Sequence, residues 1–337
     1  MNGRERVLAV LNGQKADHPP VFSANQTATY EQMKKMGAFW PDAHEKARDM
    51  ANLASGAYRI LGFDAVRVPF CQTFEAEALG AKLKHAGDKG VPSVNGHPYT
   101  LGDEPSVPEN FLSRGRIPEL IAAVRLLKEE VGNQVAVIGG IVGPFSLATS
   151  LLGVTAMLRT SFKKPDSVVP YLEVAEQAGT LLGKALIEAG ADIICVEDMM
   201  TSLNIISPPI FRGLASPYQL RQLSQLTEVP TILHICGKLN PLIEEVAKAK
   251  PTAISVEEVV NVPAAREAIK HLGRHLFIGG VNAAQTLFSG EPGDVKREVQ
   301  AALESGYDVI APSCSIPPGS PTENLLAMVE AVQAHGR

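Results

Sequence analysis

The chain has 337 residues, of which 45% are hydrophobic, 20% charged and 5% aromatic. This composition excludes disordered, collagen-like and disulfide-stapled proteins. The formal net charge of -5 argues against a general nucleic-acid binder, because such proteins present a basic surface. The length suits either about two ordinary domains or one α/β barrel.

The four cysteines, Cys71, Cys195, Cys236 and Cys314, do not form a disulfide framework in a chain of this length. The first twenty residues form a charged amphipathic stretch and not an export signal. We therefore expect a cytoplasmic protein whose reduced thiols are available for metal binding or chemistry. Val135–Leu158 contains no charged residue, but glycines and a proline interrupt it, so we expect a buried strand, a turn and an apolar helix there and no membrane span.

Short apolar runs alternate along the chain with stretches of helical periodicity. Near-continuous apolar runs are typical of parallel strands that are buried on both faces. Eight such runs alternating with helices predict an α/β fold, a single-domain (β/α)8 TIM barrel over residues 1–337. The predicted strands are Pro20–Gln26, Ala65–Phe70, Val135–Val142, Asp192–Asp198, Thr231–Cys236, Ala253–Glu258, Leu276–Asn282 and Asp308–Cys314.

The gap between the second and the third predicted strand, residues 71–134, is longer than the other gaps. It contains His85, the motifs GDKG and NGHPY and several prolines, and a helix is expected near Pro118. We expect a long, elaborated loop over the top of the barrel together with a helix insertion, and not a second domain. Loops at that end of a barrel carry function.

Reactive side chains stand at the ends of several predicted strands. The fifth run ends in His234 and Cys236, the sixth in Glu257 and Glu258, and the eighth in Cys314. Side chains two positions apart on a strand point to the same side, and the carboxyl ends of barrel strands meet at one face. An imidazole, two thiolates and a carboxylate form a tetrahedral zinc set. The alternative is a hydrogen-bonded core histidine with inert cysteines.

Other strand ends carry candidates for substrate binding. Arg67 lies near the end of the second run, where it could bind an anion or pair with Glu197 or Asp198. Asp198 ends the fourth run and fits either a pocket carboxylate or a structural pair. Asn25 and Gln26 end the first run, where they could hydrogen-bond a substrate or close the barrel.

The motifs LHICGKLN, SVEE and APSCSIPPGSPTEN resemble those of the methylcobamide:coenzyme M methyltransferases, which are members of the uroporphyrinogen decarboxylase superfamily. The resemblance extends through NQTATYEQMKKMGAFWPDAH, AVRVPFC, GGIVGPFSLATSLL and DVIAPSC, so it covers nearly the whole chain. It implies a zinc (β/α)8 barrel that moves a methyl group from a corrinoid protein to a thiol. His234, Cys236 and Cys314 match the metal positions of the family.

The resemblance also suggests a fourth ligand. A related zinc barrel, cobalamin-independent methionine synthase, has a glutamate at the spacing that corresponds here to Glu258, 24 residues after His234. We expect Glu258 as the fourth ligand and keep Glu257 as the alternative. The carboxylate is the ligand that a substrate sulfur would replace, and zinc would hold that sulfur as the nucleophilic thiolate.

The corrinoid is expected on a partner protein, because the nearest match to the corrinoid-binding motif D-x-H-x-x-G, at Asp42 and His44, lacks the glycine. The predicted enzyme is therefore a zinc-dependent methyltransferase that uses methylcobamide from a corrinoid protein and the thiol of coenzyme M. The alternatives are another acceptor such as tetrahydrofolate, methyl transfer in the opposite direction, uroporphyrinogen decarboxylase, and a non-catalytic barrel. The segment SANQTATY lacks the arginines with which the decarboxylases bind propionates.

Overall fold

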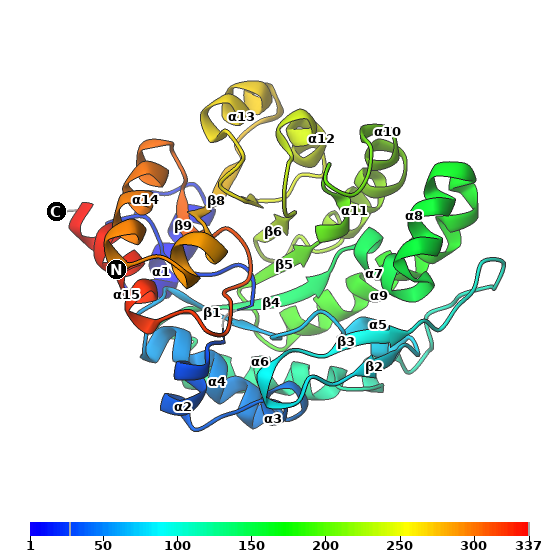
Figure 1. Ribbon diagram of the computed structural model, residues 1–337, viewed down its shortest axis with the longest axis horizontal. Helices are drawn as coiled ribbons and strands as arrows, with labels where there is room; N and C mark the ends of the chain where they lie inside the picture. Colours follow the sequence, from blue (N-terminus) through cyan, green and yellow to red (C-terminus); the bar gives the residue numbers. More distant parts are fainter. Residues whose placement is uncertain (27, 336–337) are drawn as a thin grey trace.

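The computed structural model describes residues 1–26 and 28–335. Its centre is a curled parallel sheet of seven strands in the order β1-β4-β5-β6-β7-β8-β9, and helices surround this sheet (Figure 1). Every one of these strands is buried along its whole length, which explains their continuous apolar sequences. The strands are β1 (Ala65–Val68), β4 (Ala136–Val142), β5 (Ile193–Glu197), β6 (Thr231–His234), β7 (Ala253–Val256), β8 (Leu276–Val281) and β9 (Val309–Pro312).

The first of the eight predicted strands is wrong, whereas the other seven are confirmed with shorter bounds. In its place the structure has an isolated bridge between Val21 and Ile310 of β9. The backbone N–H of Asp64, just before β1, donates to the carbonyl of Val21 at 2.8 Å. This segment therefore contacts both edges of the seven-stranded sheet. It pairs no further because the Ser23 hydroxyl donates to the carbonyl of Asn25, 3.0 Å away, and turns the chain locally.

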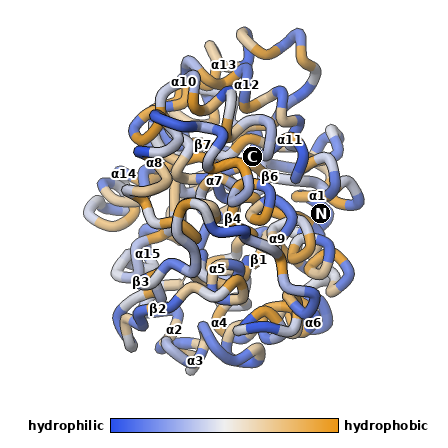
Figure 2. The backbone as a smooth tube through the Cα atoms, turned by 90° about the vertical axis from the view of Figure 1, so that its right-hand side faces the viewer, coloured by the Kyte–Doolittle hydropathy of each residue, from blue (hydrophilic) through white to orange (hydrophobic). Residues whose placement is uncertain are grey.

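Helices form the outer layer around the sheet (Figure 1), and hydrophobic and hydrophilic stretches alternate along the chain (Figure 2). At Gly139 on β4 a Cβ would lie 3.0 Å from the side chain of Leu186, so the glycine lets the longest helix approach the sheet closely. The helices are α1 (Gly3–Leu11), α2 (Tyr30–Met36), α3 (Asp42–Glu45), α4 (Ala47–Arg59), α5 (Phe74–Ala78), α6 (Ile117–Glu130), α7 (Pro144–Leu152), α8 (Val154–Lys163), α9 (Val169–Glu188), α10 (Pro208–Ile210), α11 (Ser216–Leu223), α12 (Ile243–Lys248), α13 (Val262–Ile269), α14 (Pro292–Glu304) and α15 (Thr322–His335).

A distinct cluster of small and branched side chains fills the inside of the sheet. It takes alternate residues from successive strands, such as Ala136 and Ile138 on β4 and Ile193 and Cys195 on β5. Alternation of this kind places one set of side chains inside the sheet and the other against the helices. Cys195 is fully buried in this cluster, and burial raises the pKa of its thiol. It is therefore a packing residue.

Residues 71–134 contain α5, an antiparallel hairpin of β2 (Lys82–Lys84) and β3 (Ser93–Gly96), and α6. The helix expected near Pro118 is α6, which has this proline in its first turn. The hairpin has no counterpart among the predicted strands. Its residues are exposed or half-buried, so they form no apolar run in the sequence.

The uncharged stretch Val135–Leu158 folds into β4, α7 and the first turn of α8. Among the described residues, no helix combines the length and the apolar composition that crossing a bilayer requires.

Candidate metal centre

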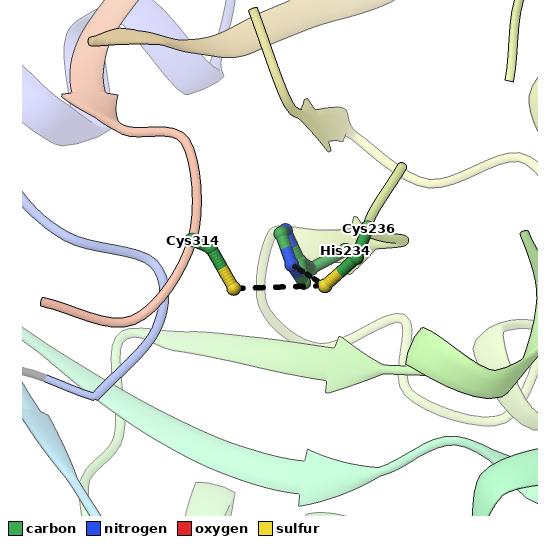
Figure 3. A group of neighbouring side chains, drawn as sticks. All are labelled: His234, Cys236 and Cys314. Atoms are coloured by element: carbon green, nitrogen blue, oxygen red, sulfur yellow. Dashed lines mark hydrogen bonds between the residues drawn. The ribbon is translucent and has the colours of Figure 1, made fainter. Parts of the chain in front are cut away.

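Three predicted ligands meet at the carboxyl ends of the strands. His234 is the last residue of β6, Cys236 follows it by two positions, and Cys314 follows the end of β9. Figure 3 shows Cys314 approaching His234 and Cys236 from a separate loop, with the two sulfur atoms turned toward each other. The ligand atoms of the three residues all lie within 4.8 Å of one another. The topology of the sheet therefore brings together side chains that are far apart in the sequence.

The distances in this group fit a single metal ion. His234 Nε2 lies 3.2 Å from the Cys236 sulfur, and the sulfurs of Cys236 and Cys314 are 3.6 Å apart. Two sulfurs bound to one tetrahedral zinc at about 2.3 Å are separated by roughly 3.8 Å. His234 is buried, whereas both cysteines are partly accessible. This donor set suits zinc and leaves an approach for a further ligand.

A hydrogen bond joins the two thiols. The hydrogen bond from Cys236 lowers the pKa of Cys314 to about 4, and His234 adds to the effect. The same hydrogen bond raises the pKa of Cys236, and burial raises it further. Cys314 is thus the thiolate, and the thiol of Cys236 donates a hydrogen bond to it. A bound cation is what would allow both to be thiolates at once.

Two polar residues hold the ring of His234. Its Nδ1 lies 3.0 Å from the hydroxyl of Ser255 on β7, and the side-chain amide nitrogen of Asn25 lies 3.3 Å from both ring nitrogens. Asn25 was predicted at the site from its place at a strand end. Ser255 was not, because one serine within an apolar run carries no signal in the sequence.

The two adjacent glutamates interact with different groups. The Glu258 carboxylate accepts a hydrogen bond from the Asn282 side chain at 2.6 Å, and Glu258 lines a cavity with Glu298 and Tyr307. Burial raises the pKa of Glu257, and the charge of the nearby Cys314 adds to the rise. Among the described residues, the group of potential ligand atoms within 4.8 Å contains neither carboxylate.

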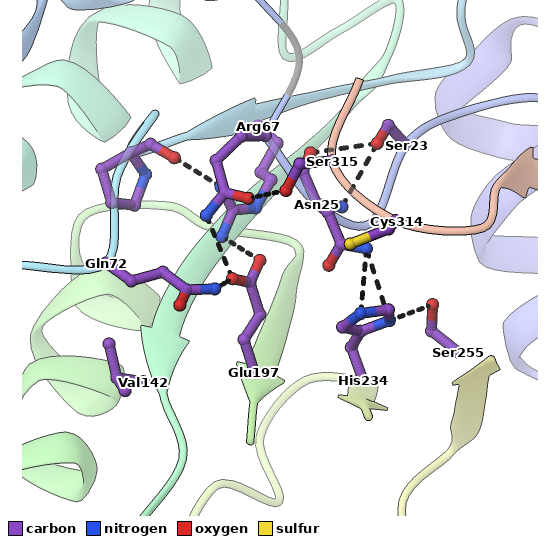
Figure 4. A network of polar contacts seen from close by, with 12 residues as sticks. Ser23, Asn25, Arg67, Gln72, Val142, Glu197, His234, Ser255, Cys314 and Ser315 are labelled. Atoms are coloured by element: carbon purple, nitrogen blue, oxygen red, sulfur yellow. Dashed lines mark hydrogen bonds and ion pairs between the residues drawn. The ribbon is translucent and has the colours of Figure 1, made fainter. Parts of the chain in front are cut away.

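Arg67 forms a buried ion pair with Glu197 inside the sheet. Gln26 and Gln72 both donate side-chain N–H groups to the same carboxylate, and the hydroxyl of Ser315 donates to the side-chain oxygen of Gln26. Figure 4 shows this network extending toward Cys314 and His234. The charge of Arg67 is therefore compensated within the protein. Gln26 connects the ion pair to the loop that carries Cys314.

Asp198 takes part in a different set of contacts. Its carboxylate accepts hydrogen bonds from the backbone N–H and the hydroxyl of Ser146, at 2.8 and 2.7 Å, and from the Gln219 side chain at 2.8 Å. These partners lie at the start of α7 and within α11. Asp198 thus ties two helices to the end of β5, which is the structural pairing weighed from the sequence.

Comparison with known proteins identifies relatives over the whole chain. The uroporphyrinogen decarboxylase (URO-D) family matches residues 2–335. The methylcobamide:CoM methyltransferase MtaA of Methanosarcina barkeri is 37% identical over 97% of this chain and 96% of its own. A uroporphyrinogen decarboxylase of Prochlorococcus marinus is 23% identical over 98% and 97%.

A solved structure agrees with these sequence comparisons. A methyltransferase from Methanosarcina mazei superimposes with a TM-score of 0.95 at 36% identity, and the match covers 100% of both chains. The resemblance inferred from the motifs around His234, Cys236 and Cys314 is confirmed by these matches. The chain belongs to the uroporphyrinogen decarboxylase family, and within it the chain is more similar to the methylcobamide:CoM methyltransferase than to the decarboxylase with which it was compared.

Proposed function

We propose that the chain is a methyltransferase that moves a methyl group from the methylcobamide of a partner corrinoid protein to the thiol of coenzyme M. The observation that carries this proposal is the convergence of His234, Cys236 and Cys314 within 4.8 Å of one another. Relatives over nearly the full length that are named methylcobamide:CoM methyltransferases give further support. Uroporphyrinogen decarboxylation would leave this thiolate-rich group without a role.

Zinc is the metal that we assign to His234, Cys236 and Cys314. When bound, zinc supplies a Lewis acid that lowers the pKa of a coordinating thiol, so that the substrate sulfur is a thiolate near neutral pH. Ser255 and Asn25 hold the imidazole of His234 in place.

We assign the fourth donor position to Glu257 and not to Glu258. The side-chain amide of Asn282 already occupies one oxygen of Glu258, and this glutamate faces Glu298 and Tyr307 in a separate cavity. The charge of Glu257, in contrast, interacts with Cys314 and with His234. Gln26 and Asn25 stay as predicted substrate contacts in this proposal. Arg67 holds Glu197 in place, and Asp198 ties α7 and α11 to the end of β5.

The remaining features of the proposal concern the architecture. We propose that the segment around Val21 takes the place of an eighth strand, so that the curled sheet acts as a (β/α)8 barrel. Residues 71–134 would form the elaborated loop over the active-site face. Two of these residues, Lys89 and Val91, line the same cavity as Ser315, which supports this placement. The chain would function as a single domain, 1–337, in the cytoplasm, where its thiols stay reduced.

The direct test is demethylation of methylcobalamin, followed by its visible absorbance, with coenzyme M or tetrahydrofolate as the acceptor. We expect turnover with the thiol and about one zinc per chain. The Cys236→Ser variant should lose both zinc and turnover. Cys195→Ala is the matched control, because Cys195 is buried in the core and lies outside the group. Full zinc content in Cys236→Ser, or turnover with tetrahydrofolate alone, would contradict the proposal.

A further inference from the structure

Two cavities share part of their walls, and the larger of them lies next to the candidate metal centre. The larger has a volume of about 560 Å³ and is lined by Ser315, the neighbour of Cys314. The smaller has a volume of about 210 Å³. Gln72 and Met199 line both cavities. We refer to the two together as the joined cavity. Its size suits an extended ligand, whereas a two-carbon thiol would fill a small part of it.

The walls of the joined cavity combine apolar side chains with uncharged polar groups. The apolar side chains include Val91 from the β2–β3 hairpin and Ile316 from the loop after β9. Trp40 lines the same cavity. Gln72 and Thr73 are among the polar groups. Among the described residues that line either cavity, Lys89 carries the one formal charge. Such a lining favours a ligand that is largely neutral, with an apolar body and polar groups on its rim.

Gln72 offers a hydrogen-bond acceptor at the junction of the two cavities. Its side-chain nitrogen donates to Glu197, which fixes the orientation of the amide. Figure 4 shows the oxygen of Gln72 on the side away from Glu197, toward Val142, and Val142 lines the smaller cavity. This carbonyl oxygen can therefore accept an N–H group from a ligand that spans both cavities.

We propose that the joined cavity binds the corrin macrocycle, with a carboxamide N–H of the corrin rim donating to the side-chain oxygen of Gln72 and with Met199 and Val91 packing on the ring. The inference rests on the proposed function and specifies the residues that recognise its methyl donor. A corrin ring is flat and carries methyl groups and neutral carboxamides on its rim, which matches the two kinds of wall. Ser315 then places the cobalt-bearing ligand beside Cys314.

The single tryptophan of the chain provides a binding assay. Trp40 lines the larger cavity, and a bound corrin absorbs its emission, so titration with methylcobalamin should quench its fluorescence. Val91→Phe adds bulk to a residue that is 43% exposed and should raise the Kd for methylcobalamin roughly tenfold. Val259→Phe is the matched control, because Val259 is 50% exposed and lines the separate cavity of Glu258. Its Kd should equal that of the wild type.

A second variant tests the hydrogen bond. Gln72→Met keeps the length of the side chain and removes its amide, so the KM for methylcobalamin should rise about tenfold while the KM for the thiol stays within twofold. A change in the thiol KM alone would overturn the inference and assign the cavity to the acceptor. Equal Kd values for wild type, Val91→Phe and Gln72→Met would overturn it as well.

Failure of this inference is distinguishable from failure of the proposed function. Cys236→Ser should still quench with methylcobalamin, because Cys236 lies outside the lining of both cavities. If the wild type transfers the methyl group but neither Val91→Phe nor Gln72→Met changes methylcobalamin binding, the corrin site is wrong and the proposed function stands. If the two variants weaken methylcobalamin binding but the wild type transfers no methyl group to any thiol, the corrin site stands and the proposed function fails.

Discussion

His234 and Ser255 are direct partners in the register of β6 and β7, and His234 Nδ1 lies 3.0 Å from the hydroxyl oxygen of Ser255. When Nδ1 donates its proton to this hydroxyl, the lone pair of Nε2 is directed at Cys236, 3.2 Å away. A hydrogen bond of this kind fixes the tautomer and the orientation of a metal-binding histidine. The strand pairing therefore selects which nitrogen of His234 is available to a metal.

Replacing Ser255 should weaken metal binding without removing a ligand. We expect Ser255→Ala to lower the affinity for zinc about 10- to 100-fold, measured by competition with a chromophoric chelator. Ser255→Thr keeps the hydroxyl and should retain most of the affinity. Equal affinities for the wild type and Ser255→Ala would mean that the hydrogen bond does not orient His234.

The assignment of Glu257 predicts unequal effects for two neighbouring substitutions. Glu257→Gln should lose zinc faster than the wild type during dialysis against a chelator, because it removes a carboxylate whose charge interacts with Cys314. Glu258→Gln should retain zinc within twofold, since the Glu258 carboxylate is bound to Asn282. Zinc content and the rate of methylcobalamin demethylation should be measured on both variants. The reverse pattern would favour Glu258, the residue expected from spacing.

Glu75 should make the folded state less stable as the pH rises. Burial raises the pKa of this carboxyl to about 7, above the value near 4.5 that is expected in the unfolded chain. The folded state therefore binds more protons between these two values, and stability falls as the pH rises from about 4.5 to about 7. The loss amounts to about 3 kcal/mol once Glu75 is ionised.

Glu75→Gln isolates this effect. A glutamine oxygen can still accept the hydrogen bond that the backbone N–H of Val142 donates to Glu75 at 2.7 Å. The variant should match the wild type near pH 4 and be more stable near pH 8, by up to about 3 kcal/mol. Urea unfolding at both pH values provides the measurement. A constant difference between the two proteins across this range would show that Glu75 does not titrate there.

Removing one member of the buried ion pair between Arg67 and Glu197 should destabilise the folded state. Arg67→Met leaves the carboxylate of Glu197 without its cation and should reduce the free energy of unfolding by about 3–5 kcal/mol. The double variant Arg67→Met/Glu197→Gln keeps acceptors for Gln26 and Gln72 and removes the stranded charge, so it should recover most of the loss. If the double variant is as unstable as the single one, packing of the Arg67 side chain is responsible and not its charge.

Much of the architecture could be read from the sequence because buried parallel strands leave a strong signal. Runs such as Val135–Val142 are apolar at every position, and seven of them became strands. The strand predicted near Val21 is wrong because composition cannot distinguish a strand from one bridge followed by a local turn at Ser23. The β2–β3 hairpin was missed because its strands have three and four residues, and alternation over so few positions cannot be distinguished from a loop.

The metal centre was predictable to the extent that its residues continue a strand. His234 and Cys236 are two apart, so the alternation of side chains applies to them. Glu257 and Glu258 lie beyond β7, which ends at Val256, and alternation gives no information there. The spacing from His234 favoured Glu258, and this choice stays a prediction alongside the alternative argued from contacts. Ser255 could be found once the register was known.

The bridge between Val21 and Ile310 joins the beginning of the chain to β9, the last strand to be synthesised. Cys314 follows this strand and lies 78 residues after Cys236. A nascent chain on the ribosome therefore exposes His234 and Cys236 well before their third partner exists, and it can offer a metal ion only an incomplete set of donors. The complete set of three donors therefore exists only after β9 has joined the sheet.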